Sequence, residues 1–183
     1  MSCQSTARAR PALRFRAHFG LGQCYYNLMG LRDHPKMAIT QWGKAEELRP
    51  TNPDVLASLA LIDLLSGDMS AARERADRAR QEAPRHPVAR SVLAQVMGKE
   101  EGPLQALTDV YGYKAPGFAP GELDDDDAGA HGTVAHLLAQ IGMFGEAMEH
   151  AEEAVAVGDG RPDVWKVLGW TRLAAATQRR SSG

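Results

Sequence analysis

Apolar residues recur at spacings of three and four along most of the chain, and this is the spacing of one face of an α-helix. The first such run consists of Phe15, Phe19, Gly22, Tyr26 and Met29. Pro11 precedes the run and suits the first turn of a helix, where a missing N–H leaves no hydrogen bond unmade. The same spacing returns in later segments, so the pattern predicts an all-α protein.

A fixed interval of 34 residues orders the predicted helices. Small residues and a closing proline recur at this interval, namely Ala38, Ala45 and Pro50 and then Ala72, Ala79 and Pro84. Such a period is typical of antiparallel helix pairs that stack as repeats. The small residues are expected where helices cross closely, and proline ends the second helix of each pair. After the third repeat the next match falls seven residues late, across a segment rich in Pro, Gly and Asp.

The helix boundaries of the second repeat can be predicted from its capping residues. Asn52 is an N-cap candidate and is followed by proline at the first helical position. Gly67 is expected to end this helix, and the side chain of Asp68 is expected to cap the next one. The residues therefore predict one helix from Pro53 to Ser66 and a second that starts after Asp68.

Two short sequences share a Leu-Gly pair: Leu21-Gly22-x-x-Tyr25 and Trp165-x-x-Leu168-Gly169. Together with the 34-residue period, they resemble the first helix of the tetratricopeptide repeat (TPR) family. The resemblance implies a right-handed TPR-type α-solenoid of antiparallel helix pairs. It also implies that Gly22 lets the second helix of its pair approach closely, and that Tyr25 fills the groove between the two helices.

The resemblance divides the chain into five units and three flanking or connecting segments. The units are expected at 12–50, 51–84, 85–113, 128–160 and 161–177, and the last is a single helix. Residues 1–11 and 178–183 are expected to be flexible. The acidic segment 114–127 is expected to be a loop with little apolar surface to bury. Deleting Gly121–Asp127 is expected to change stability little.

The charges of the chain are unevenly distributed around a formal net charge of −2. Residues 1–50 carry eight Lys or Arg and three acidic residues, whereas residues 114–160 carry one Lys and ten acidic residues. The arginines at 73, 75, 78 and 80 alternate with acids, which favours a solvated outer helix face with a Glu74–Arg78 ion pair. The basic residues do not interleave with exposed aromatic residues along one face, so we expect no nucleic-acid binding.

The two cysteines, Cys3 and Cys24, cannot form a disulfide framework, and we expect Cys24 to be a small core residue. No apolar run approaches the ~20 residues that cross a bilayer, so no membrane insertion is expected. The protein is expected to be cytoplasmic. The four arginines near the N-terminus leave organellar targeting open as an alternative.

The sequence nominates no catalytic residue, metal ligand or cofactor site. The four adjacent acids Asp124–Asp127 lack the alternate spacing and glycine of a calcium loop. His131 and His136 are five residues apart and point in different directions on a helix. Nucleotide, zinc and hydrolase motifs are missing. We therefore expect a protein that is not an enzyme.

The TPR resemblance implies a concave groove lined by the first helix of each unit. The expected groove residues are Phe19, Gln23, Tyr26 and Asn27 in the first unit, Ala57, Leu61, Leu64 and Leu65 in the second, Ser91 and Gln95 in the third, His136 and Gln140 in the fourth, and Lys166 and Trp170 in the fifth. Leu64 and Leu65 could equally be core residues. The Lys, Asn and Arg set of chaperone-binding TPR proteins is missing from these positions.

These observations predict a non-catalytic scaffold or adaptor that binds a protein or peptide in a concave TPR groove. Two alternatives stay open: a regulatory or substrate-recruiting segment of a larger enzyme, and a secretion-type TPR chaperone. The last helix carries Trp165, Leu168, Trp170 and Leu173 but no partner helix follows it. We expect this end to dock onto a second copy, a partner, or the remainder of a longer chain.

Overall fold

The computed structural model describes residues 3–28, 34–114, 123, 127–158 and 162–181. The side chains of residues 3–9, 162–164, 179 and 181 are not described. Within these ranges the chain forms helices and no strand. The helices are α1 (Cys3–Asn27), α2 (His34–Leu48), α3 (Pro53–Ser66), α4 (Met69–Glu82), α5 (Pro87–Glu100), α6 (Pro103–Tyr111), α7 (Ala128–Gln140), α8 (Phe144–Val157) and α9 (Pro162–Ser181). The chain divides into two compact units, Met1–Ala89 and Arg90–Gly183.

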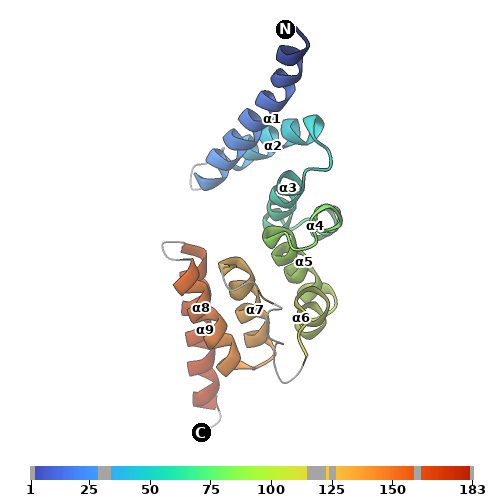
Figure 1. The fold of residues 1–183 in the computed structure, drawn as a ribbon. Helices are drawn as coiled ribbons and strands as arrows, with labels where there is room; N and C mark the ends of the chain where they lie inside the picture. Colours follow the sequence, from blue (N-terminus) through green and yellow to red (C-terminus); the bar gives the residue numbers. More distant parts are fainter. Residues whose placement is uncertain (1–2, 29–33, 115–122, 124–126, 159–161, 182–183) are drawn as a thin grey trace. The chain divides into compact units, whose positions relative to one another are not determined.

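In the first unit, α1 packs against α2, α2 against α3, and α3 against α4 (Figure 1). The largest buried side chain here is Trp42 of α2, which is 1% exposed. It packs with Phe15 of α1 and with Val55, Leu59 and Ile62 of α3. A second apolar cluster joins Leu56 and Ala57 of α3 to Ala79 of α4 and Ala89.

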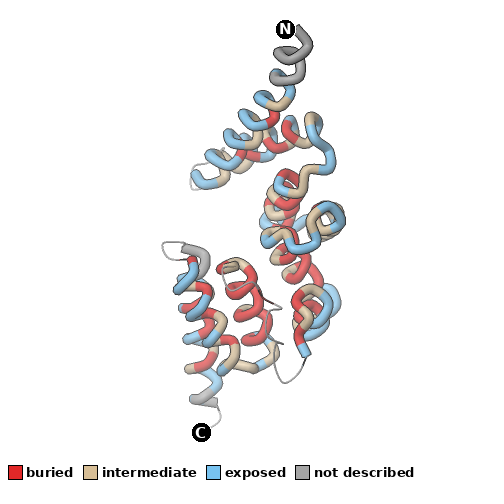
Figure 2. The backbone as a smooth tube through the Cα atoms, in the orientation of Figure 1, coloured by how far each residue is buried: buried red, intermediate tan, exposed pale blue. Residues whose placement is uncertain are grey.

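In the second unit, α6 contacts α7, and α7, α8 and α9 pack against one another (Figure 1). The central helix of this unit is α7, which is buried along most of its length, in contrast to α1 (Figure 2). Leu168 of α9 packs against Ala135 of α7 and Ala151 of α8. A helix buried on nearly all sides needs apolar residues around its whole circumference, and the sequence Thr133–Ala139 supplies them with few charges.

The predicted interval of 34 residues marks the close helix crossings in the structure. The small residues at two positions of the repeat have no exposed surface, and those of α8 fit the series after the seven-residue shift. The first position is occupied by Ala38, Ala72, Ala106 and Ala147, and the second by Ala45, Ala79 and Ala154. Any larger side chain at these places would meet the packed neighbouring helix. The all-α fold of paired helices predicted from the sequence is confirmed.

The predicted caps of α3 and α4 are also confirmed. The side chain of Asn52 accepts a hydrogen bond from the Val55 N–H at 3.1 Å, and Asp68 accepts one from the Ala71 N–H at 3.0 Å. Gly67 lies between the two helices with a φ of 89°, in the left-handed region that favours glycine. These local groups satisfy backbone donors that the helix leaves unpaired.

Two helix ends differ from the sequence expectation. Helix α1 begins at Cys3, inside the segment 1–11 that was expected to be flexible, and α9 continues to Ser181. Pro11 lies inside α1 rather than in its first turn. An interior proline costs a helix ~3 kcal/mol, which is why the pattern placed the start there. The preceding residues Ala7–Arg10 are strong helix formers, and the helix extends through them.

Cys24 is exposed on α1, so its prediction as a core residue is wrong. The core face of α1 is formed instead by Phe15 and Gly22, with Tyr25 half-buried beside them. Among the described residues, no helix combines the length and the apolar character that crossing a bilayer requires.

Candidate functional site

The residues predicted to line a groove all lie on α1, α3, α5, α7 and α9, which are the first helices of the five predicted units. They fall into two groups. Helices α1 and α3 belong to the first unit. Helices α7 and α9, and α5 from Arg90 onward, belong to the second unit. We describe the two groups separately.

In the first unit, the aromatic members of the predicted set support the core as well as the surface. Tyr26 is half-buried, with its ring 5.6 Å from that of Trp42. Phe19 is half-buried, and its carbonyl accepts a hydrogen bond from the indole N–H of Trp42 at 3.3 Å. Gln23 and Asn27 are exposed on the same helix. Of the predicted groove residues on α1, the exposed ones are therefore these two amides.

On α3, the predicted residues split between core and surface. Ala57 and Leu64 are buried, with Leu64 only 7% exposed, so both are core residues rather than contact residues. Leu61 is half-buried, and Leu65 is 58% exposed. Of the two leucines that could have been either core or surface, Leu64 faces inward and Leu65 faces solvent.

In the second unit, three predicted residues meet directly. The His136 ring of α7 lies 4.7 Å from the Trp170 ring of α9, centroid to centroid. The Gln140 side chain lies one turn further along α7, and its Nε2 is 2.8 Å from Nε2 of His136. Because an amide N–H₂ can only donate, this contact makes His136 Nε2 the acceptor and leaves the ring proton on Nδ1. Trp170 remains 40% exposed.

The neighbouring helix α5 carries the other two predicted residues of this unit. The Ser91 hydroxyl is 2.6 Å from the Thr133 hydroxyl of α7, and Gln95 donates from Nε2 to Ser91 Oγ at 3.3 Å. These polar contacts join α5 to α7 beside the His136 ring. Lys166 is exposed one turn before Trp170 on α9, so the two side chains lie on the same side of that helix.

The surroundings of His136 favour the neutral form of its ring. Burial lowers the pKa of His136, and the positive charge of Lys99 on α5 lowers it further. We call the set Gln95, Lys99, His136, Gln140, Lys166 and Trp170 the unit 2 surface. It combines an exposed aromatic ring, two amides, a neutral imidazole and two cations.

A pair of histidines that the sequence did not predict lies between α7 and α8. Nδ1 of His131 is 3.0 Å from Nδ1 of His150. Burial and the neighbouring His131 lower the pKa of His150 to about 4. His131 itself is buried, and its Nε2 has no hydrogen-bond partner among the described residues. The two residues are 19 positions apart on two helices, so only the helix-pair geometry brings them together.

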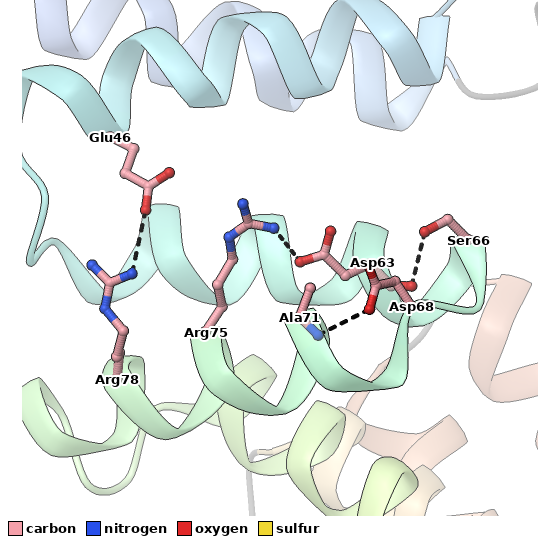
Figure 3. A network of polar contacts seen from close by, with 7 residues as sticks. All are labelled: Glu46, Asp63, Ser66, Asp68, Ala71, Arg75 and Arg78. Atoms are coloured by element: carbon pink, nitrogen blue, oxygen red, sulfur yellow. Dashed lines mark hydrogen bonds and ion pairs between the residues drawn. The ribbon is translucent and has the colours of Figure 1, made fainter.

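The arginines of α4 were predicted to form a solvated outer face, and the structure corrects this for two of them. Arg75 pairs with Asp63 of α3, and Arg78 pairs with Glu46 of α2 at 3.7 Å (Figure 3). Arg78 also donates to the Pro50 carbonyl at 3.1 Å. The predicted Glu74–Arg78 pair is therefore replaced by contacts between helices. Arg80 keeps the predicted pattern, since it pairs within α4 with Asp77 at 3.6 Å.

The acidic segment contributes one capping residue to the described structure. Asp127 accepts a hydrogen bond from the Ala130 N–H at 2.9 Å and thereby caps α7. Asp124–Asp126 lie outside the described residues. Within the described part of the chain, no three His, Cys, Asp or Glu side chains are grouped as a metal site would require.

Comparisons with known proteins give likenesses of structure only. No protein-family model and no curated protein matches the chain. TTC0263, a thermophilic TPR protein of Thermus thermophilus, has a TM-score of 0.66 at 20% identity, over 87% of this chain and 82% of that one. PilF of Pseudomonas aeruginosa has a TM-score of 0.63 at 16% identity, over 93% of this chain and 71% of that one.

A third neighbour, from the APC/C hetero-tetramer Cut9-Hcn1, has a TM-score of 0.59 at 16% identity over 84% of this chain, but only 29% of that chain is covered. Together with the helix pairs and the buried small residues at the 34-residue interval, these likenesses settle the architecture. The chain has the all-α fold of tetratricopeptide repeat proteins.

Proposed function

We propose that this protein is a non-catalytic scaffold that binds a protein or peptide segment, and that the unit 2 surface is its main contact site. The TPR fold supports the general role, because stacked helix pairs present their first helices as one continuous binding surface. Among the structural neighbours, Cut9 occurs in a hetero-tetramer with Hcn1. The proposal includes no reaction, and within the described residues no group of three or more His, Cys, Asp or Glu side chains could hold a metal ion.

The observation that carries the proposal is the meeting of Trp170, His136 and Gln140 across α7 and α9. A half-exposed tryptophan supported by a neighbouring ring is the kind of residue that dominates binding energy at protein interfaces. The ring contact between His136 and Trp170 fixes the indole in place before binding, which reduces the ordering cost of association.

The polar members of the unit 2 surface suggest the chemistry of the partner. Gln95 and Gln140 can both donate to and accept from the backbone of an extended segment. Lys99 and Lys166 favour acidic side chains on the partner. We therefore propose a partner segment in which an apolar or aromatic residue, seated against Trp170, is flanked by acidic residues.

Selection of a displayed random-peptide library against the immobilised protein tests this proposal. The selected peptides should contain an apolar residue next to acidic ones, and fluorescence anisotropy should give their Kd. Trp170→Ala should raise the Kd by about tenfold or more, which corresponds to the ~1.4 kcal/mol or greater loss typical of a central interface residue.

Trp165→Ala is the matched control, because Trp165 lies on the same helix and is similarly exposed, at 50% against 40% for Trp170. It should leave the Kd within about twofold. If Trp165→Ala abolished binding and Trp170→Ala left it intact, the unit 2 surface would not be the contact site. Far-UV circular dichroism and melting curves of both variants exclude loss of fold as the cause.

A further inference from the structure

Helix α1 carries an apolar stripe on the side opposite to its core face. Leu13, Leu21 and Leu28 are 63%, 46% and 54% exposed, and Ala17 and Cys24 are also exposed. The five residues follow one another at spacings of four, four, three and four, so they lie on one side of the helix. We call these five residues the α1 stripe. It is separate from the core face, where Phe15 and Gly22 are buried.

Helix α9 carries a second apolar side that is largely exposed. Trp165 and Leu173 are 50% and 66% exposed, and Gly169 lies midway between them at spacings of four. A Cβ atom built on Gly169 would have no atom within 4 Å. At the matching glycine of α1, Gly22, a Cβ would lie 2.4 Å from the Trp42 indole of α2. The space beside Gly169 that corresponds to the one filled by Trp42 beside Gly22 is therefore not filled by any described residue.

The charges beside these two surfaces are complementary. Helix α1 contains four arginines and no acidic residue, and its described arginines Arg10, Arg14 and Arg16 are exposed. Helix α8, which packs against α9, contains four glutamates and no Lys or Arg. Glu152 of α8 pairs with Arg172 of α9 at 3.5 Å, so the acidic side of α8 borders the open side of α9.

We propose that the α1 stripe of one copy docks on the open side of α9 of a second copy, in a head-to-tail association. Opposite charges favour this pairing over a contact between two α1 stripes. Two α1 stripes would bring their arginines together, whereas docking on α9 places these arginines beside the glutamates of α8. The inference goes beyond the proposed function and does not depend on it, since the surfaces involved lie outside the unit 2 surface.

A head-to-tail contact has a defined consequence for assembly. Each copy keeps one open α1 stripe and one open α9 side after the first contact, so further copies can add. The average mass of the full chain should therefore increase continuously with concentration rather than stop at a dimer. Sedimentation velocity across a concentration series measures this directly.

Two variants block one surface each at exposed positions that the fold tolerates. Leu13→Glu plus Leu21→Glu places acids on the α1 stripe, facing the glutamates of α8 in the complex. Trp165→Ser plus Leu173→Ser removes the apolar side of α9. Each variant alone should sediment as a monomer. A Leu104→Glu variant, at another leucine that is 51% exposed, should associate like the wild type.

An equimolar mixture of the two blocked variants decides the geometry. Head-to-tail docking leaves one intact α9 side and one intact α1 stripe, so the mixture should form a 1:1 dimer that does not grow. A wild type that stays monomeric at its highest soluble concentration would overturn the inference. A mixture that stays monomeric would also overturn it, because the mixture still offers the one α9 side and the one α1 stripe that head-to-tail docking needs. Either variant dimerising on its own would overturn it as well, because that would show that the contact uses the same surface on both copies. Unchanged circular dichroism spectra of the variants confirm that each is folded.

Discussion

The contact between Gly22 and Trp42 shows at the scale of single residues how the repeat pattern becomes structure. Trp42 is 1% exposed, and its indole occupies the space that a side chain at Gly22 would need. An indole held by Phe15 and by a hydrogen bond to the Phe19 carbonyl has little room to shift. Glycine is therefore required at this position by packing and not by backbone conformation.

Gly22→Ala should destabilise the protein by about 1–3 kcal/mol, because the added methyl group overpacks the helix contact. Gly20→Ala is the matched control, since its Cβ would meet nothing within 4 Å. That change should leave stability unchanged or raise it by ~0.5–1 kcal/mol, as expected for replacing glycine in a helix. Urea unfolding of both variants measures the difference, and equal midpoints would show that the Trp42 contact does not constrain Gly22.

The His131–His150 pair gives the stability of the protein a pH dependence. The folded protein holds the pKa of His150 at about 4, below its ordinary value of 6.5. Between these values the unfolded chain binds more protons than the folded one, so lowering the pH through this window lowers the free energy of unfolding. The contribution is fully present above about pH 6.5. The change in the free energy of unfolding stays below the ~1.4 kcal/mol per pH unit that one full proton difference gives, because the His150 ring is partly exposed.

His150→Gln should therefore flatten the loss of stability between about pH 6.5 and pH 4. Urea unfolding at several pH values in this range measures the slope for the wild type and the variant. A residual slope is expected, since the pKa of His136 is also lowered. Identical slopes in the two proteins would show that His150 is not the group that titrates.

At the scale of helices, local signals predicted the ends well and the contacts between helices poorly. Asn52, Gly67 and Asp68 could be placed from the sequence because each acts on backbone groups within a few residues. The partners of Arg75 and Arg78 lie on other helices, and the sequence offered nearer acids instead. For the same reason the sequence did not predict the His131–His150 pair, since the two residues lie on different helices. The start of α1 at Cys3 was missed because Pro11 looked like a helix beginning.

The segment between α6 and α7 shows a second limit of sequence patterns. Its composition predicted a loop without buried surface, yet Leu123 is 8% exposed and Asp127 caps α7. Leu123 stands directly before four acids, and an isolated apolar residue in such a place carries no periodic signal. The expectation that deleting Gly121–Asp127 changes stability little did not consider the buried Leu123 or the cap at Asp127.

Leu123→Ala should destabilise the protein by about 2–3 kcal/mol, as the loss of a buried leucine usually does. Leu104→Ala, at a leucine of α6 that is 51% exposed, is the control and should change stability by less than ~0.5 kcal/mol. Thermal and urea unfolding measure both. Equal, small effects would mean that Leu123 adds nothing to the core of the second unit.

At the scale of the whole molecule, the account rests on two separate kinds of surface. The unit 2 surface is polar and aromatic and is proposed to bind a foreign segment. The α1 stripe and the open side of α9 are apolar and are proposed to bind a second copy. The sequence predicted Gln95, His136, Gln140 and Trp170 for the first kind through their repeat positions. It predicted an exposed apolar end at α9, but it did not predict the stripe on α1, because Cys24 resembled a core residue.

The three tryptophans allow the central claim to be measured in one experiment. Trp42 is buried in the first unit, whereas Trp165 and Trp170 lie on different sides of α9. In a nitrogen-15 correlation spectrum, each indole N–H gives its own signal. The Leu13→Glu plus Leu21→Glu variant is used, so that self-association does not move the signal of Trp165.

A selected peptide is titrated into this variant. The account predicts that the Trp170 indole signal shifts together with the amide signals of Gln95, His136 and Gln140, while the Trp42 and Trp165 indole signals stay in place. A shift of the Trp165 signal with no change at Trp170 and His136 would contradict the claim that the unit 2 surface is the binding site.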